Sequence, residues 1–338
     1  MKQTRQNFRL IFKLVFIGIL GVGLTWADKS KPTSILKEMQ FQQRKRLYWL
    51  HLPPWEKTGT EIPLVVVMHG GGGNGKSAEA MSGFSAKADK EGFIVVYPYG
   101  TGEQDDRSLT WNAGTCCGYA LFNGVDDVGF IRTLVEELAD KYPIDRTKIF
   151  ATGMSNGGMM AYRLACEASD IFSGIGDVAG AMNVQSCESL RTVSMMIIHG
   201  RADLVVLFEG GARDKSVTEK WRHDRSVSYA INFWKKRNGC KKFRKSKKGI
   251  VTRRDYQCTH APLSLVVIKN EGHTWPGGEK LYEGADEPTQ KFSATDALWE
   301  FWNHSQPDKK NLQPEEKLPP KPDMQIGMGE TLREKLLR

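Results

Sequence analysis

Short apolar runs recur along the middle of this chain, with longer amphipathic stretches between them. Runs that are apolar almost throughout are typical of strands buried on both faces of a sheet. They fall at 64–68, 93–97, 148–152, 194–199 and 263–269. An earlier segment at 44–53 alternates polar and apolar residues, which predicts an edge strand.

Between these runs the apolar residues recur at helical spacing. Phe130, Leu134 and Leu138 follow one another at every fourth position, which predicts a helix over 127–142. Similar patterns occur at 227–237 and 294–302. Because strands and helices alternate, we expect an α/β fold: a single domain with a mostly parallel central sheet and helices on both of its faces.

The two ends of the chain differ in character from this core. Residues 1–27 contain four bases, an apolar run and a small-x-small site at its end, which predicts a secretory signal peptide. The run is too short to span a bilayer comfortably, although an uncleaved anchor is the alternative. Residues 305–338 are rich in proline and charge and predict a solvated tail. The folded domain is therefore expected over 35–304, in a protein that is secreted or periplasmic.

Export changes the interpretation of the six cysteines, because thiols in an oxidising compartment usually pair. Cys240 and Cys258 bracket a basic segment and are expected to close it into a hairpin. The connectivity of the other four stays open. No C-x-x-C pair occurs, so we expect no structural zinc site.

The net charge of +9 comes in large part from the basic segment at 235–248. This segment has one aromatic residue, Phe243, and no recognisable binding motif. We therefore expect a solvated loop beside a helix, and no nucleic-acid partner.

The most specific chemical motif is Gly153-Met154-Ser155-Asn156-Gly157, which reads G-x-S-x-G between a predicted strand and a helical pattern. In this context the two glycines allow a tight turn that exposes a serine hydroxyl above a sheet. Ser155 is therefore the candidate nucleophile.

A serine nucleophile needs a base, and the base needs a carboxylate to orient it. His273 follows the last predicted strand, where such a sheet presents reactive groups. Asp203 lies in the loop after the strand at 194–199, in an H-G-x-x-D pattern, and is the expected acid. Two alternatives remain: Asp203 only caps a turn, or Asp177, one strand earlier, is the acid.

The oxyanion hole requires two backbone N–H groups. One is expected from Asn156 and the other from Gly71, with Gly72 as the alternative, in the glycine-rich loop 69–74. The overlapping stretch 70–77 also fits the pattern of a phosphate-binding P-loop. The serine elbow downstream and the predicted export favour the oxyanion role.

Three further features are open to two interpretations. The pair Asp126 and Asp127 resembles a catalytic carboxylate pair, but at the start of a helix we expect a structural, capping role. Trp111 and Trp275 are candidates for lining the substrate pocket, and either indole could simply pack.

These segments together resemble the exported esterase family that includes polyhydroxybutyrate depolymerases and feruloyl (cinnamoyl) esterases. The matching segments, spread over nearly all of 44–303, lie at 69–74, 97–100, 111–118, 125–131, 151–162, 199–206 and 272–278. The resemblance implies an α/β-hydrolase fold and a Ser-Asp-His mechanism at Ser155, Asp203 and His273. The chain departs from the family at Leu204 and at Leu207-Phe208, where the family often has proline and a proline-tyrosine pair.

The sequence thus predicts an exported serine carboxylic ester hydrolase that works through an acyl-enzyme and needs no cofactor or metal. Its expected substrates are hydroxycinnamoyl or acetyl esters of polysaccharide, or hydroxyalkanoate oligomers. The alternatives are a non-catalytic envelope-binding protein of the same fold and a serine peptidase. No stable membrane span is expected after signal cleavage, and the oligomeric state stays open.

Overall fold

The computed structural model describes residues 34–54, 60–212 and 222–304. The predicted signal peptide at 1–27 and the predicted tail at 305–338 lie outside these residues. The described strands are β1 (Ile35–Phe41), β2 (Arg44–His51), β3 (Ile62–Met68), β4 (Ile94–Pro98), β5 (Ile144–Met154), β6 (Gly174–Val178), β7 (Ser194–Gly200), β8 (Cys240–Lys248), β9 (Val251–Cys258) and β10 (Leu263–Ile268). The described helices are α1 (Gly75–Ser82), α2 (Phe84–Glu91), α3 (Gly118–Phe122), α4 (Asp127–Lys141), α5 (Asn156–Glu167), α6 (Val227–Arg237) and α7 (Ala294–His304).

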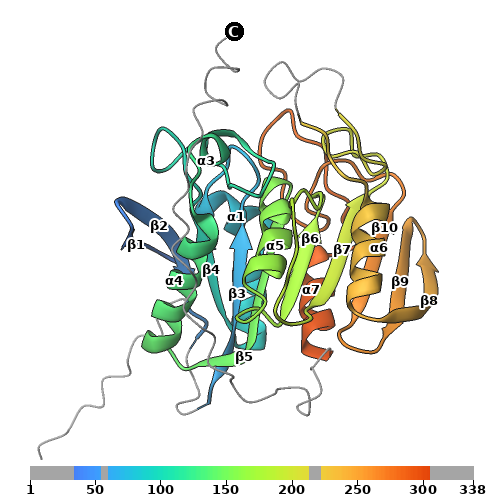
Figure 1. Ribbon diagram of the computed structural model, residues 1–338, viewed down its shortest axis with the longest axis horizontal. Helices are drawn as coiled ribbons and strands as arrows, with labels where there is room; N and C mark the ends of the chain where they lie inside the picture. The colour runs from blue at the N-terminus through green and yellow to red at the C-terminus, as the bar shows by residue number, and fades with distance from the viewer. Residues whose placement is uncertain (1–33, 55–59, 213–221, 305–338) are drawn as a thin grey trace, which may run out of the picture.

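All ten strands form one sheet in the order β1-β2-β4-β3-β5-β6-β7-β10-β9-β8 (Figure 1). From β4 to β10 neighbouring strands run parallel, whereas the pairs at both ends of the sheet are antiparallel. The prediction of a mostly parallel sheet is confirmed. The prediction that 44–53 is an edge strand is wrong, because β1 pairs with the outer side of β2 and takes the edge.

Helices cover both faces of the sheet, as predicted. Figure 1 shows α4, α5 and α6 on one face, where their apolar side chains join a large core cluster. Side chains of α1, α2 and α7 form a second cluster on the other face. Strand β3 shows why its sequence is apolar throughout: Leu64 and Val66 point into the first cluster, and Val65 and Val67 into the second.

The basic segment is not the expected solvated loop. Residues 235–237 end α6, and residues 240–248 form β8, which pairs with β9 in the expected hairpin, antiparallel and at one end of the sheet. The predicted pairing of Cys240 with Cys258 is confirmed, and these residues face each other at the base of the hairpin. The other disulfides join Cys116 to Cys117 and Cys166 to Cys187.

No helix in the described part of the chain combines the length and the apolar character needed to cross a bilayer.

Candidate active site

Ser155 stands at the junction where β5 ends and α5 begins, in a conformation that L-residues rarely adopt, with φ of 57°. The flanking glycines are required by close backbone approaches. A Cβ on Gly153 would lie 2.6 Å from the carbonyl oxygen of Gly157, and a Cβ on Gly157 would lie 2.4 Å from that of Met68. The G-x-S-x-G sequence therefore folds into a turn that only glycine at both positions allows.

The glycine-rich loop after β3 runs beside this turn. The Cβ positions of Gly70 and Gly71 lie 3.5 Å from the Ser155 Cβ and 3.8 Å from the Asn156 Cβ, respectively. Gly71 is exposed, and Asn156 is the first residue of α5, where backbone N–H groups lack partners within the helix. The two predicted oxyanion donors thus lie next to each other and next to the serine.

A buried histidine, His69, fixes the shape of this loop. Its Nδ1 hydrogen-bonds the carbonyl oxygen of Gly70 at 2.7 Å, and its Nε2 accepts from the N–H of Gly100 at 2.9 Å. Nε2 is an acceptor, so the ring proton sits on Nδ1. Burial lowers the pKa of His69 to about 4, and the ring is neutral at physiological pH.

The side chain of Asn156 ties the nucleophile turn to Trp111. Its Oδ1 accepts from the Trp111 N–H at 2.7 Å, and its Nδ2 donates to the Trp111 carbonyl at 3.1 Å. The indole of Trp111 in turn donates to the carbonyl of His69 at 3.0 Å. Trp111 therefore connects the two segments that carry the predicted oxyanion donors.

The predicted acid and base are in direct contact. The Nδ1 of His273 lies 2.8 Å from the Oδ2 of Asp203, and the other carboxylate oxygen accepts from the backbone N–H groups of Val205 and Val206, both at 2.8 Å. Among the described residues no hydrogen bond joins the Ser155 hydroxyl to His273. Catalytic hydrogen bonds are often long in enzymes without substrate.

The Asp203 carboxylate remains charged although it is buried. Burial alone would raise its pKa, but the hydrogen bond and charge of His273, together with the backbone hydrogen bond from Val206, hold the pKa below its ordinary value. His199 lies 3.5 Å away and donates from Nε2 to the carbonyl of Val206. Burial lowers the pKa of His199, so the ring is neutral. It supports residues 201–206, the loop that carries Asp203, which we call the acid loop.

Two acidic side chains that the sequence analysis missed hold the loop of His273. Asp286 accepts from the His273 N–H at 2.7 Å, and Glu271 accepts from the Thr289 N–H at 3.1 Å and from the Thr274 hydroxyl. No sequence pattern marks Asp286, because it reaches His273 from a later part of an irregular loop.

The rival acid, Asp177, has no histidine partner among the described residues. It is fully buried on β6, accepts a hydrogen bond from the Tyr162 hydroxyl at 3.2 Å, and lies against the backbone of Gly180. Burial raises the pKa of Asp177 to about 8, which keeps it largely protonated at neutral pH. A neutral acid cannot stabilise a histidinium, so this geometry favours Asp203.

The two tryptophans are both buried. Trp111 packs against His69, and Trp275 packs edge-on against Phe84 and donates to Thr295 at 3.0 Å. The described contacts of both indoles are therefore with protein, and the proposed contact with substrate stays a prediction.

The remaining alternatives have structural explanations. Asp126 caps α4 through the N–H of Gly129, as expected. Asp127 instead forms a buried ion pair with Arg46 at 2.7 Å. In the stretch that fits a P-loop, Asn74 and Ser77 bond each other's backbone in a capping box that starts α1.

A parallel sheet with helices on both faces, and a serine on a strained turn at the carboxyl edge of its strands, define the α/β-hydrolase class. The sequence profile of the family described as esterase PHB depolymerase matches residues 47–218. The chain belongs to this family, and it is a carboxylic ester hydrolase.

Individual relatives agree with this assignment. The chain is 30% identical over 272 residues to "Putative esterase NocK" of Nocardia uniformis subsp. tsuyamanensis, covering 75% of this chain and 77% of the relative. It is 29% identical over 269 residues to feruloyl esterase C of Emericella nidulans, covering 76% and 83%. The solved structure of the protein sOPH superimposes with a TM-score of 0.53 at 16% identity, over 87% of this chain and 94% of that one, which shows the fold alone.

Proposed function

We propose that Ser155, Asp203 and His273 form the catalytic triad of this esterase, with the N–H groups of Gly71 and Asn156 as its oxyanion hole. The observation that carries the proposal is the 2.8 Å contact between His273 Nδ1 and Asp203. Nδ1 faces the carboxylate, so the other ring nitrogen, Nε2, is the one left to accept the proton of Ser155.

Each step of ester hydrolysis then has a residue to perform it. Ser155 Oγ attacks the ester carbonyl carbon while His273 takes its proton, and the developing oxyanion accepts from the N–H groups of Gly71 and Asn156. His273 returns the proton to the departing alcohol, which leaves an acyl-serine. A water molecule, deprotonated by His273, attacks this ester and releases the acid and the free serine.

The proposed substrates are hydroxycinnamoyl or acetyl esters of polysaccharide, or hydroxyalkanoate oligomers. The similarity to feruloyl esterase C supports the first class, and the name of the family supports the second. We further propose that residues 1–27 are a signal peptide, that 35–304 form the esterase domain, and that the protein works outside the cytoplasm. Its three disulfides support this location.

The test is hydrolysis of p-nitrophenyl acetate by the purified protein and by Ser155→Ala. Loss of activity in this variant, with full activity in the exposed-serine control Ser246→Ala, is the expected result. Equal activity of Ser155→Ala and the unmodified protein would overturn the assignment of the nucleophile. A panel with methyl ferulate and a 3-hydroxybutyrate oligomer then separates the two substrate classes.

A further inference from the structure

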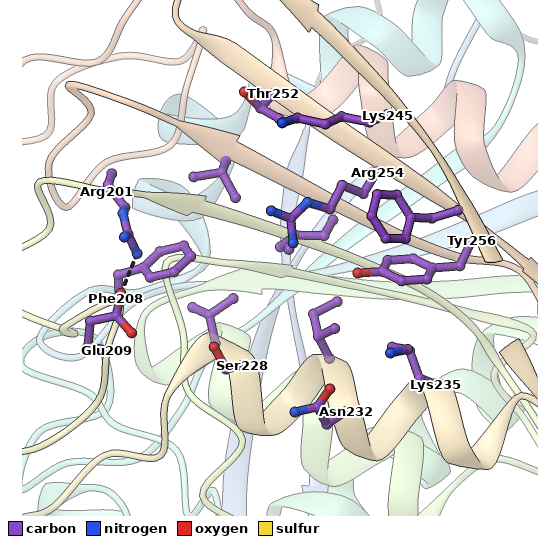
Figure 2. A pocket seen from close by; sticks show the side chains of 15 residues that line it. Arg201, Phe208, Glu209, Ser228, Asn232, Lys235, Lys245, Thr252, Arg254 and Tyr256 are labelled. Atoms are coloured by element: carbon purple, nitrogen blue, oxygen red, sulfur yellow. Dashed lines mark hydrogen bonds and ion pairs between the residues drawn. The ribbon is translucent and has the colours of Figure 1, made fainter. Parts of the chain in front are cut away.

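A cavity lies outside the triad, between α6 and the strands β8, β9 and β10 (Figure 2). Its volume is about 570 Å³, which is within the range of small-molecule binding sites. We call it the hairpin groove. Ser228, Asn232 and Lys235 line it from α6, where they recur at helical spacing, and the hairpin forms the opposite wall.

The strand register decides which basic side chains enter the hairpin groove. Lys245 pairs with Arg254, and Phe243 pairs with Tyr256, and all four line the groove. Successive side chains of a strand point to opposite faces. The neighbouring bases Arg244 and Lys248 are therefore on the far face of the hairpin.

The groove carries an excess of positive charge. Its lining contains the cations Arg201, Lys235, Lys245 and Arg254 and one carboxylate, Glu209, which is paired with Arg201. Within the described part of the chain, Lys235, Lys245 and Arg254 have no carboxylate partner. The Nε of Arg254 is buried and has no hydrogen-bond partner among the described residues. A buried donor without a partner is costly, so an anion that accepted from it would be bound favourably.

Three of these four cations lie against aromatic rings of the groove. The guanidinium of Arg201 lies 4.4 Å from the ring centre of Phe208, that of Arg254 lies 5.5 Å from Phe243, and the Lys235 ammonium lies 5.9 Å from Tyr256. Sites for single-stranded nucleic acid use free ring faces to stack bases. Here each of the three rings has a cation over one face, which favours a ligand that offers acidic groups to the cations.

One end of the groove touches the acid loop of the triad. Arg201 directly follows β7 and donates its backbone N–H to Ile268, the last residue of β10, at 2.8 Å. The ring of Phe208 packs edge-on against His199, which lies 3.5 Å from Asp203. The groove therefore starts at the edge of the sheet that carries the proposed triad and runs away from it along the hairpin.

We propose that the hairpin groove binds uronic-acid units of an acidic polysaccharide, whose ester group is placed at Ser155; this inference rests on the proposed esterase function. Three cations without a carboxylate partner, spread along the groove, suit a chain that carries repeated carboxylates better than a single acid. Ser228, Asn232 and Thr252 supply hydroxyl and amide groups between the cations, which can bond the sugar hydroxyls.

Binding is tested apart from catalysis, in the Ser155→Ala protein. Isothermal titration calorimetry compares a glucuronic-acid-bearing xylo-oligosaccharide with a neutral xylo-oligosaccharide of equal length. We expect the acidic sugar to bind more tightly, and Lys245→Gln with Arg254→Gln to weaken its binding by about tenfold or more. The control, Arg244→Gln with Lys248→Gln, removes the same two charges from the far face and should change the affinity little. Circular dichroism verifies that each variant is folded.

Three results would overturn the proposal. The first is equal affinity for the acidic and neutral sugars, and the second is equal weakening of binding in both double variants. The third is a single-stranded oligonucleotide that binds as tightly as the acidic sugar and no longer binds to the Lys245→Gln, Arg254→Gln protein. Failure of the esterase function is recognised separately. Absence of ester turnover by the unmodified protein, together with selective binding of the acidic sugar, contradicts the proposed function and leaves the binding site standing.

Discussion

The two sides of the proposed active site are held in place by different means. On the side of β3 and β5, Ser155 and the glycine-rich loop 69–74, the oxyanion loop, are held mainly by backbone geometry. Ser155 has a positive φ, and the glycines lie against carbonyl oxygens. The neutral ring of His69 adds a hydrogen bond to the backbone of the loop. On the side of β7 and β10, Asp203 and His273 are fixed by a charged hydrogen bond and by backbone donors to the carboxylate.

This difference predicts how each side fails. The nucleophile side should respond to the size of a side chain, because its contacts are close approaches of backbone atoms. The acid–base side should respond to charge even when size is unchanged, because its carboxylate is buried and ionised. The following four substitutions test this contrast.

The largest expected effect is that of Asp203→Asn, which removes the charge and keeps the size. The amide cannot accept from His273 and stabilise its cation as the carboxylate does, so kcat should fall by a factor on the order of 10³–10⁴. Stopped-flow or steady-state hydrolysis of p-nitrophenyl acetate measures it. Asp126→Asn is the control, since asparagine caps a helix as well as aspartate does. A loss of less than tenfold would contradict the assigned role.

Gly157→Ala tests the nucleophile side through size alone. The added Cβ would lie 2.4 Å from the Met68 carbonyl oxygen, so the turn must shift. We expect a loss of about 1–3 kcal/mol in the free energy of unfolding and about 10²-fold in kcat, because the serine moves with the turn. Gly284→Ala is the matched control, since its Cβ would have no neighbour closer than 3.9 Å. Unchanged melting and rate in Gly157→Ala would show that this side is less rigid than described.

His69→Ala should have a smaller effect on the same side. It leaves the buried Gly100 N–H without its acceptor and releases the carbonyl of Gly70, at a cost of about 1–3 kcal/mol in stability. The displaced oxyanion donors should lower kcat about 10- to 100-fold with little change in KM. The control is the exposed His304→Ala.

The same variant has a pH signature. The pKa of His69 is about 4 in the folded protein, below its ordinary value, so the unfolded chain binds more protons between those two values. The unmodified protein should therefore lose stability as the pH falls from about 6.5 to 4, and His69→Ala should lose less. Urea unfolding across this range measures the difference, and identical slopes would contradict the neutral buried ring.

Asp177→Asn should have the smallest effect, although this aspartate is as buried as Asp203. Its folded pKa of about 8 lies above the unfolded value, so the folded protein binds the extra proton between about 4 and 8. Stability from this group is present at low pH and is lost as the pH rises to about 8. The substitution should flatten that decline and leave kcat almost unchanged. A loss of activity comparable to that of Asp203→Asn would instead make Asp177 the acid.

Local patterns in the sequence were sufficient to predict the central strands and the order in which the candidate site residues follow one another along the chain. Continuous apolar runs marked the strands buried on both faces, and the elbow motif located Ser155. Strand β6 was missed because it contains Gly174 and Gly176, which are unusual in strands. The structure explains them: a Cβ at these positions would collide with Trp302 and Leu298 of α7.

Features that depend on tertiary contacts could not be predicted. The sequence of β8 has basic residues at both odd and even positions, and only its register with β9 separates the bases of the hairpin groove from those on the far face. Likewise, no sequence pattern assigns a role to His69. Its role as the support of the oxyanion loop follows from Gly100, which lies on a different strand connection.

The position of β8 also bears on how the protein behaves in concentrated solution. A strand at the end of a sheet offers unpaired backbone groups to any second sheet that approaches. Here the approaching copy would bring its own row of lysines, exposed along the same strand, against those of the first. Like charges at such short range repel, and salt screens this repulsion. The basic strand is therefore expected to oppose edge-to-edge pairing of two copies at low ionic strength, and to do so less as salt is added.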